Sequence, residues 1–173
     1  MTSNNYTDPS RDYSHMYNIT DIRGPLPYPR FNTNTILGFL SSDPAVKDFF
    51  DLVSSNKSIS GIFNNEQAAF TLFVPINCNN IKPENTEAYD VIKIVRYHTL
   101  ENKLTPELLG SMGSSLISTK CWSKNIFVEN RICNNKKYTF LNQGQAIIVG
   151  YKSLGDSNIF FIDNILSEFK SIL

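Results

Sequence analysis

Residues 70–77 read Phe-Thr-Leu-Phe-Val-Pro-Ile-Asn, and this short apolar stretch decides how the chain folds. Thr, Val and Phe favour a pleated surface, so a run of this length is better placed in a buried strand than in a buried helix. Pro75 has no N–H to donate to a central ladder, and we therefore expect the strand to end there. The residues that follow, Cys-Asn-Asn at positions 78–80, are typical of a turn.

Two more stretches extend this pattern along the chain. Residues 94–98 read Ile-Val-Arg-Tyr-His, and residues 159–166 read Ile-Phe-Phe-Ile-Asp-Asn-Ile-Leu. In this order, and together with residues 71–77, they resemble the conserved boxes of the fasciclin domain, the beta-Ig-h3 adhesion domain family. The positions that match the family motifs are Thr71, Leu72, Phe73, Pro75, Asn77, Tyr97, His98, Ile162 and Asp163.

The resemblance covers roughly residues 34–166 and implies an α+β fold. In that fold an antiparallel wedge or sandwich of short strands has several helices packed at one side. The chain departs from the family pattern at Ile76, Ser157 and Phe160, where the family usually has Thr, Gly and His. These changes make the region more apolar, and we expect them to remove a polar partner from His98.

The periodicity of residues 34–173 predicts helices first and strands later. Thr35 can cap a helix over residues 36–40, and Ser42 or Asp43 can cap a second helix that begins at Pro44. Further helices are expected over residues 87–100 and from Thr105. Short runs of β-formers separated by Asn and Gly turns predict strands over residues 116–119, 126–129, 137–141, 146–149 and 159–162.

Two features near the later strands have two interpretations each. Trp122 lies in a connection between strands, where we expect partial burial over a sheet edge; a partner-binding anchor is the alternative. Ile165, Leu166 and Phe169 begin an apolar stripe at helical spacing that reaches the end of the sequence. It predicts a C-terminal helix that docks on the core or, alternatively, binds a partner through residues such as Phe169.

Residues 1–33 differ from the rest and predict an extended N-terminal arm before a single domain over residues 34–173. The arm is rich in Asn, Ser and Tyr and shows no helical or strand period, and proline at every second position over residues 25–29 favours a polyproline-like ribbon. Such ribbons dock into grooves; a linker, or an arm folded back on its own domain, is the alternative. The arm residues that we expect to bind a partner are Tyr17, Pro25, Pro27, Tyr28, Pro29 and Phe31.

No motif for catalysis is present in the sequence. His98 near a helix C-terminus would be favoured as an imidazolium by the helix dipole and invites a catalytic interpretation. However, no nucleophile elbow, phosphate loop or metal-ligand spacing accompanies it. The resemblance implies instead that His98 is structural and ties its helix to the first box. We expect a non-enzymatic protein with no cofactor and no metal.

Composition limits the partners. Sixteen basic residues balance sixteen acidic ones, which argues against nucleic-acid binding, and charged residues make up only 18% against a typical value of about 25%. The odd count of three cysteines predicts reduced structural thiols and is consistent with a reducing compartment. No stretch resembles a secretory signal or a bilayer span, so we expect no direct membrane insertion and an intracellular or virion location.

Two functional hypotheses follow. The first is a protein-protein interaction module that serves as a structural component of a larger assembly and contacts neighbouring subunits through its N-terminal arm. An Asn-rich composition without a signal peptide also suits large DNA viruses, some of which carry fasciclin-like domains, and our specific form of this hypothesis is a minor capsid or virion protein. The alternative is an extracellular adhesion ligand of fasciclin type. It would depend on Tyr97, His98 or Asp163.

Overall fold

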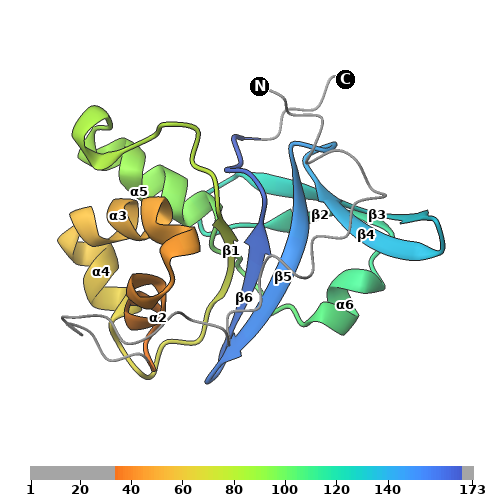
Figure 1. Ribbon diagram of the computed structural model, residues 1–173, viewed down its shortest axis with the longest axis horizontal. Coiled ribbons are helices and arrows are strands. Elements are labelled where there is room, and N and C mark those ends of the chain that lie inside the picture. Colours follow the sequence, from red (N-terminus) through yellow and green to blue (C-terminus); the bar gives the residue numbers. More distant parts are fainter. Residues whose placement is uncertain (1–33, 169–173) are drawn as a thin grey trace.

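The computed structural model describes residues 34–168 (Figure 1), so the predicted N-terminal arm lies outside the described residues. The α-helices are α2 (Ile36–Ser42), α3 (Lys47–Ser55), α4 (Lys57–Phe63), α5 (Ala88–Tyr97) and α6 (Pro106–Gly110), with short 3-10 helices at η3 (Pro44–Val46) and η4 (Pro83–Asn85). The strands are β1 (Thr71–Pro75), β2 (Ser114–Ser118), β3 (Asn125–Cys133), β4 (Lys136–Leu141), β5 (Ala146–Leu154) and β6 (Ser157–Ile162).

The predicted helix caps are present. The Thr35 hydroxyl accepts a hydrogen bond from the Gly38 N–H at 3.0 Å, and an Asp43 carboxylate oxygen accepts one from the Ala45 N–H at 3.0 Å. Each cap satisfies a donor that has no partner inside its own helix. The sequence did not predict α4. Its cap is Asn56, whose side chain accepts a hydrogen bond from the Ile59 N–H at 3.1 Å.

The strands form one mixed sheet in the order β1-β6-β5-β4-β3-β2. The pairs from β2 to β6 are antiparallel as predicted, whereas β1 pairs with β6 in parallel. Strand β1 therefore lies at the end of the ladder, and the segment after α5 covers its free edge: the Phe73 N–H donates to His98 O at 2.8 Å. This edge position is compatible with Pro75 at the end of the strand.

The strand pair β1–β6 lies between two hydrophobic cores. Helices α2 to α5 lie together on one side of it, and the antiparallel strands extend away from the other side with α6 beneath them (Figure 1). Leu72 and Phe161 belong to the core on the helix side, while Phe73, Phe160 and Ile162 belong to the core on the side of β3 and β4. Successive side chains of a strand point to opposite faces. A strand with a core on each face therefore has a continuous apolar run.

The predicted α+β fold with helices packed at one side of short strands is confirmed. Predicted turns are also present: Asn134 and Asn135 have φ of 51° and 65°, the left-handed pair that a tight β3–β4 hairpin requires. Between β4 and β5, Gln143 and Gly144 likewise have positive φ, 59° and 91°.

The chain after β6 is not helical where it is described. The Ile165 N–H donates to Asn77 O at 2.8 Å, the Leu166 N–H to the His98 ring, and the Ser167 N–H to the Gln145 side chain. These donors are used by distant parts of the chain, and no helical turn is present over residues 163–168. The predicted C-terminal helix is therefore wrong for residues 164–168, and Phe169 lies outside the described residues.

Candidate functional site

The residues that match the family boxes come together where the ends of β1, α5 and β6 meet. Backbone hydrogen bonds join the three segments: Phe73 N–H to His98 O at 2.8 Å, and Ile76 N–H to Ile162 O at 3.0 Å. We call this region the motif junction. It contains Thr71, Leu72, Phe73, Pro75, Asn77, Tyr97, His98, Ile162 and Asp163.

His98 is the centre of the motif junction. Its Nε2 accepts a hydrogen bond from the Leu166 N–H at 3.0 Å, so the ring proton is on Nδ1, which lies 2.8 Å from Ile94 O. The side chain is fully buried, and burial lowers its pKa to about 4, against the opposing effect of the bond to Ile94. The helix dipole would favour an imidazolium, but burial of the ring favours the neutral form. Phe160 offers no polar group, and the polar partner of Nε2 is the backbone N–H of Leu166.

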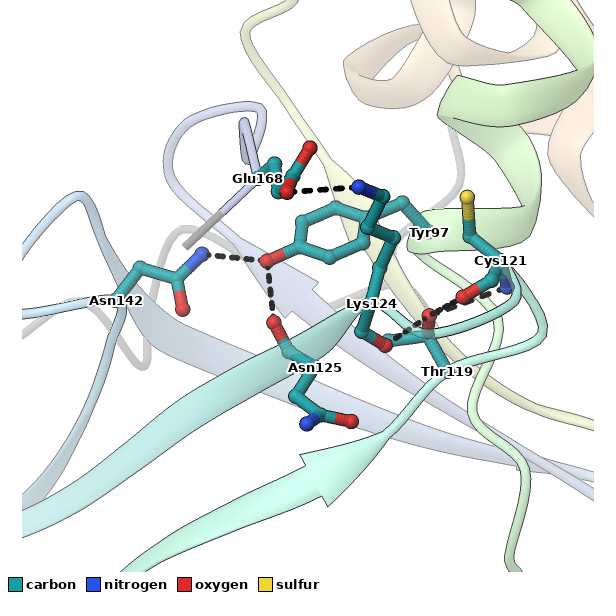
Figure 2. A network of polar contacts seen from close by, with 7 residues as sticks. All are labelled: Tyr97, Thr119, Cys121, Lys124, Asn125, Asn142 and Glu168. Carbon is teal, nitrogen blue, oxygen red and sulfur yellow. Dashed lines mark hydrogen bonds and ion pairs between the residues drawn. The ribbon is translucent and has the colours of Figure 1, made fainter. Parts of the chain in front are cut away.

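Tyr97 links the motif junction to the start of β3. Its hydroxyl donates to Asn125 O at 2.7 Å and accepts from Asn142 Nδ2 at 3.0 Å (Figure 2). Asn142 also donates to Ser167 O at 3.0 Å. One buried phenol thus fixes β3, the β4–β5 turn and the chain after β6 to the end of α5.

Asp163 joins the end of β6 to the start of β5 by hydrogen bonds. One carboxylate oxygen accepts from the Ile147 N–H at 2.9 Å, and the Asp163 N–H donates to Ile147 O at 3.2 Å. Burial raises the pKa of this carboxyl to about 7, although the hydrogen bonds from the backbone of Ile147 and Asp163 oppose the shift. The other oxygen is buried and has no hydrogen-bond partner among the described residues.

Thr71 and Asn77 fix the two ends of the first box. The Thr71 hydroxyl accepts from the Leu104 N–H at 3.1 Å, and the Asn77 side chain accepts from the Asn79 N–H at 2.9 Å. The departure at Ser157 has a local role as well, because its hydroxyl accepts from the Phe70 N–H at 3.0 Å. The motif residues therefore organise the backbone.

The motif junction offers little to an external partner. Tyr97, His98 and Asp163 are 5%, 0% and 9% exposed. Both ring nitrogens of His98 are engaged, so the histidine has no free position for acid-base chemistry. A partner that touched these three side chains directly would have to displace the core around them.

Trp122 differs from the motif residues because it is 90% exposed. The predicted partial burial over a sheet edge is wrong. Ser123, the next residue in the connection from β2 to β3, has φ of 63°. This left-handed residue directs the chain back toward β3 and leaves the indole in solvent.

Residues 120–124, which we call the Trp122 turn, are held by short hydrogen bonds. The Thr119 hydroxyl donates to Lys124 O at 2.8 Å and accepts from the Cys121 N–H at 3.1 Å, and the Lys124 N–H donates to Cys121 O at 3.0 Å. The Lys124 ammonium lies 2.9 Å from a Glu168 carboxylate oxygen, as Figure 2 shows. The turn is therefore a closed loop with one large aromatic side chain at its tip.

A cavity that the sequence did not predict lies between α4 and α5. Its volume is about 330 Å³, and its lining includes Arg96, Thr99 and Lys120. Its apolar lining is formed by Ile59, Ile62, Phe63, Phe70, Ile92 and Val95. Sequence reasoning could place the apolar residues on helix faces, but it could not show that two faces leave a gap.

The three thiols show no sign of a redox or metal site. Cys78, Cys121 and Cys133 are free, as predicted. Burial, with a smaller contribution from Asp48 and Asp51, raises the pKa of the Cys78 thiol to about 12, which makes it unreactive. Within residues 34–168, no group of three or more His, Cys, Asp or Glu side chains could hold a metal ion. No helix in that part of the chain has the length and hydropathy needed to cross a bilayer.

Several predicted partner-binding residues cannot be placed. The arm residues Tyr17, Pro25, Pro27, Tyr28, Pro29 and Phe31 lie outside the described residues, as does Phe169. Of the predicted interface residues, the structure thus places only Trp122.

Comparison with known proteins identifies the fold. No family model matches the sequence, and no curated protein matches it. A solved structure does: a FAS1 domain pair from the insect cell adhesion molecule Fasciclin I, with a TM-score of 0.56 and 20% sequence identity. The fold is that of a FAS1 domain. The likeness covers 81% of this chain and 52% of the solved one, so this chain spans about half of that pair.

The FAS1 likeness corrects one prediction and leaves another without support. The predicted intracellular or virion location is wrong, because the solved FAS1 pair comes from a cell adhesion molecule, which points to the cell surface. Nothing in the comparison supports a viral origin.

Proposed function

We propose that this chain is a non-enzymatic adhesion module of FAS1 type, secreted or held at the cell surface, that binds other proteins. The observation that carries the proposal is the fold shared with a FAS1 domain pair from a cell adhesion molecule. It supports the adhesion hypothesis over the capsid hypothesis, for which the described residues offer no observation. The motif junction supports a non-enzymatic role because its histidine is neutral and fully engaged.

The partner is proposed to contact the Trp122 turn. Trp is enriched among the residues that contribute most to binding energy at interfaces. The hydrogen bonds of Thr119 and Lys124 hold the turn before any partner arrives. A preformed loop loses less conformational entropy on binding than a flexible one.

The domain division remains part of this proposal. Residues 34–173 form the FAS1-type domain and residues 1–33 an arm whose Pro and Tyr residues add a second contact with the partner. Deletion of residues 1–33 should then weaken attachment without abolishing it. Unchanged attachment of the deletion variant would remove the arm from the proposal.

Cell attachment tests the adhesion function. The full chain is coupled to beads, and the number of cells or matrix-coated surfaces bound is compared for wild type, Trp122→Ala and Tyr89→Ala. Tyr89 is the matched control because it is also an exposed aromatic residue, at 68%, but lies on α5. We expect Trp122→Ala to lose about tenfold or more in affinity, as truncation of a central aromatic anchor does, and Tyr89→Ala to bind normally.

Two results would contradict the proposal. If wild-type beads bind no cell type or matrix protein, the adhesion function fails. If Trp122→Ala and Tyr89→Ala bind equally well, the adhesion function stands but the Trp122 turn is not its contact. Both variants change exposed side chains, so their free energies of unfolding should stay within about 0.5 kcal/mol of wild type.

A further inference from the structure

The cavity between α4 and α5 has the size and the lining of a ligand site. Its volume is about 330 Å³, at the lower end of the roughly 300–1,000 Å³ found for small-molecule pockets. Phe63 and Phe70 form a wall in which the ring centroids lie 5.6 Å apart in an edge-to-face contact. Ile62 lines the cavity and is 52% exposed, so apolar surface here is in contact with water. An apolar group placed in the cavity would remove that surface from solvent.

One part of the cavity is cationic. Arg96 lies one helical turn before Thr99, and the Lys120 N–H donates to Thr99 O at 2.7 Å, so the two cations belong to neighbouring backbone segments. The Lys120 ammonium lies 3.7 Å from a Glu101 carboxylate, but both side chains are well exposed, and such pairs are weak. The lining of the cavity therefore combines apolar side chains with two positive charges, from residues that Thr99 joins.

From this arrangement we infer that the cavity binds a medium-chain fatty acid as its carboxylate, with the tail on the apolar wall and the head group at Arg96 and Lys120. A guanidinium donates two parallel hydrogen bonds to a carboxylate, which suits Arg96 for the head group. The C-terminal end of α5 carries a partial charge of about −0.5, and two full positive charges outweigh it. The inference does not rest on the adhesion function: Lys120 belongs to both the Trp122 turn and the cavity, but the Trp122 side chain is not part of the lining.

The first test compares two ligands that differ only in the head group. The full chain is titrated by calorimetry with decanoate, below the concentration at which it forms micelles, and with decanol. We expect one saturable site for decanoate. Decanol should bind more weakly by about fivefold or more, because it cannot form the solvent-exposed ion pairs with the two cations. Equal affinity for both ligands would overturn the assignment of an anionic ligand. Absence of saturable decanoate binding would overturn the whole inference. Occupation of the cavity by residues 1–33 or by a second copy of the chain would give this same result.

The second test locates the site with matched variants. Ile62→Asp places a negative charge at the cavity, and Leu108→Asp makes the same kind of change on α6, at the nearly equal exposure of 51%. We expect Ile62→Asp to weaken decanoate binding by about tenfold or more, because the new carboxylate would be buried against the ligand tail or would repel its carboxylate. Leu108→Asp should leave decanoate binding unchanged. If the two variants weaken binding equally, the ligand does not sit in this cavity.

The third test examines the two cations. Arg96→Ala should weaken decanoate binding by about two- to fivefold and should leave decanol binding unchanged. Glu101→Gln should strengthen decanoate binding by up to about twofold, because it releases Lys120 from its ion pair. Identical effects of Arg96→Ala on both ligands would mean that the head group does not contact the cations.

Discussion

The motif junction and the Trp122 turn are both held by short hydrogen bonds, but one encloses its aromatic side chains and the other presents its aromatic side chain to solvent. Tyr97 and His98 are almost fully buried, whereas Trp122 is 90% exposed. The difference teaches that the positions that make the family recognisable build the fold, and that a contact surface is to be sought elsewhere. The two regions nevertheless touch, because Tyr97 bonds to Asn125, next to the end of the turn.

The packing on either side of β1 explains why the motif junction tolerates little change. Phe73 is fully buried and packs edge to face on Phe160, with ring centroids 5.9 Å apart. The backbone of the same residue donates to His98 O. Removing the Phe73 side chain would thus open a cavity in the core next to a strand edge that depends on one short segment for cover.

The largest expected effect comes from Phe73→Ala. Truncation of a buried Phe costs about 3–5 kcal/mol through lost burial and the cavity left behind, and we expect that loss in the free energy of unfolding measured by urea denaturation. Tyr89→Ala is the exposed control and should change it by less than about 0.5 kcal/mol. A loss below about 1 kcal/mol for Phe73→Ala would show that the junction is not the stable centre of the fold.

A second prediction concerns the opposite pKa shifts of His98 and Asp163. The pKa of His98 falls from 6.5 to about 4, so the unfolded state binds more protons between these values and stability decreases as pH falls through them. The pKa of Asp163 rises from 3.8 to about 7, so the folded state binds more protons there and stability decreases as pH rises. The two dependences oppose each other between about pH 4 and pH 6.5.

Replacement of Asp163 should reveal the pH dependence that His98 contributes to stability. Asp163→Asn keeps an oxygen that can accept from the Ile147 N–H but does not titrate. We compare the free energy of unfolding of the variant with that of wild type. The difference, variant minus wild type, should rise by about 3 kcal/mol from pH 4 to pH 7, because only wild type loses the stability linked to the raised pKa of Asp163. Urea denaturation at intervals of half a pH unit measures the difference, and parallel curves for the two proteins would contradict it.

The sequence predicted the parts of the fold that depend on local chemistry. Local chemistry of this kind predicts the caps at Thr35 and Asp43, the strand that ends at Pro75 and the turn at Asn134. The apolar run in β1 predicted a buried strand, and the run in β6 predicted a strand. Their parallel pairing was not predicted, because it depends on where a connection of roughly 80 residues returns the chain. The resemblance supplied the order of the elements.

What the sequence did not predict depends on distant partners. The stripe that begins at Ile165 and Leu166 has helical spacing, yet the N–H groups of these residues bond to Asn77 and His98, which lie far away in the sequence. Burial decided the charge of His98 in the same way, because no local signal shows that a helix end will be covered. Trp122 was expected to be partly covered since large aromatic residues usually are. Its exposure follows from a turn at Ser123 that the sequence does not mark.

The smallest expected effect tests the link between the two regions. Tyr97→Phe removes the hydroxyl that donates to Asn125 O and accepts from Asn142, and the loss should cost about 1–2 kcal/mol. Tyr151→Phe is the matched control because the Tyr151 hydroxyl donates a short hydrogen bond as well, to the Asn158 side chain at 2.7 Å, on another part of the sheet. Both variants should lose some stability.

Only Tyr97→Phe should loosen the Trp122 turn. Trp122 is the single Trp of the chain, so its fluorescence anisotropy reports the motion of that turn alone. We expect lower anisotropy and weaker cell attachment for Tyr97→Phe, and wild-type values of both for Tyr151→Phe. Such a result would mean that a buried family residue acts in adhesion by supporting an exposed one. If the anisotropy of Tyr97→Phe equals that of wild type, the turn is held by Thr119 and Lys124 alone, and the motif junction and the contact surface are independent.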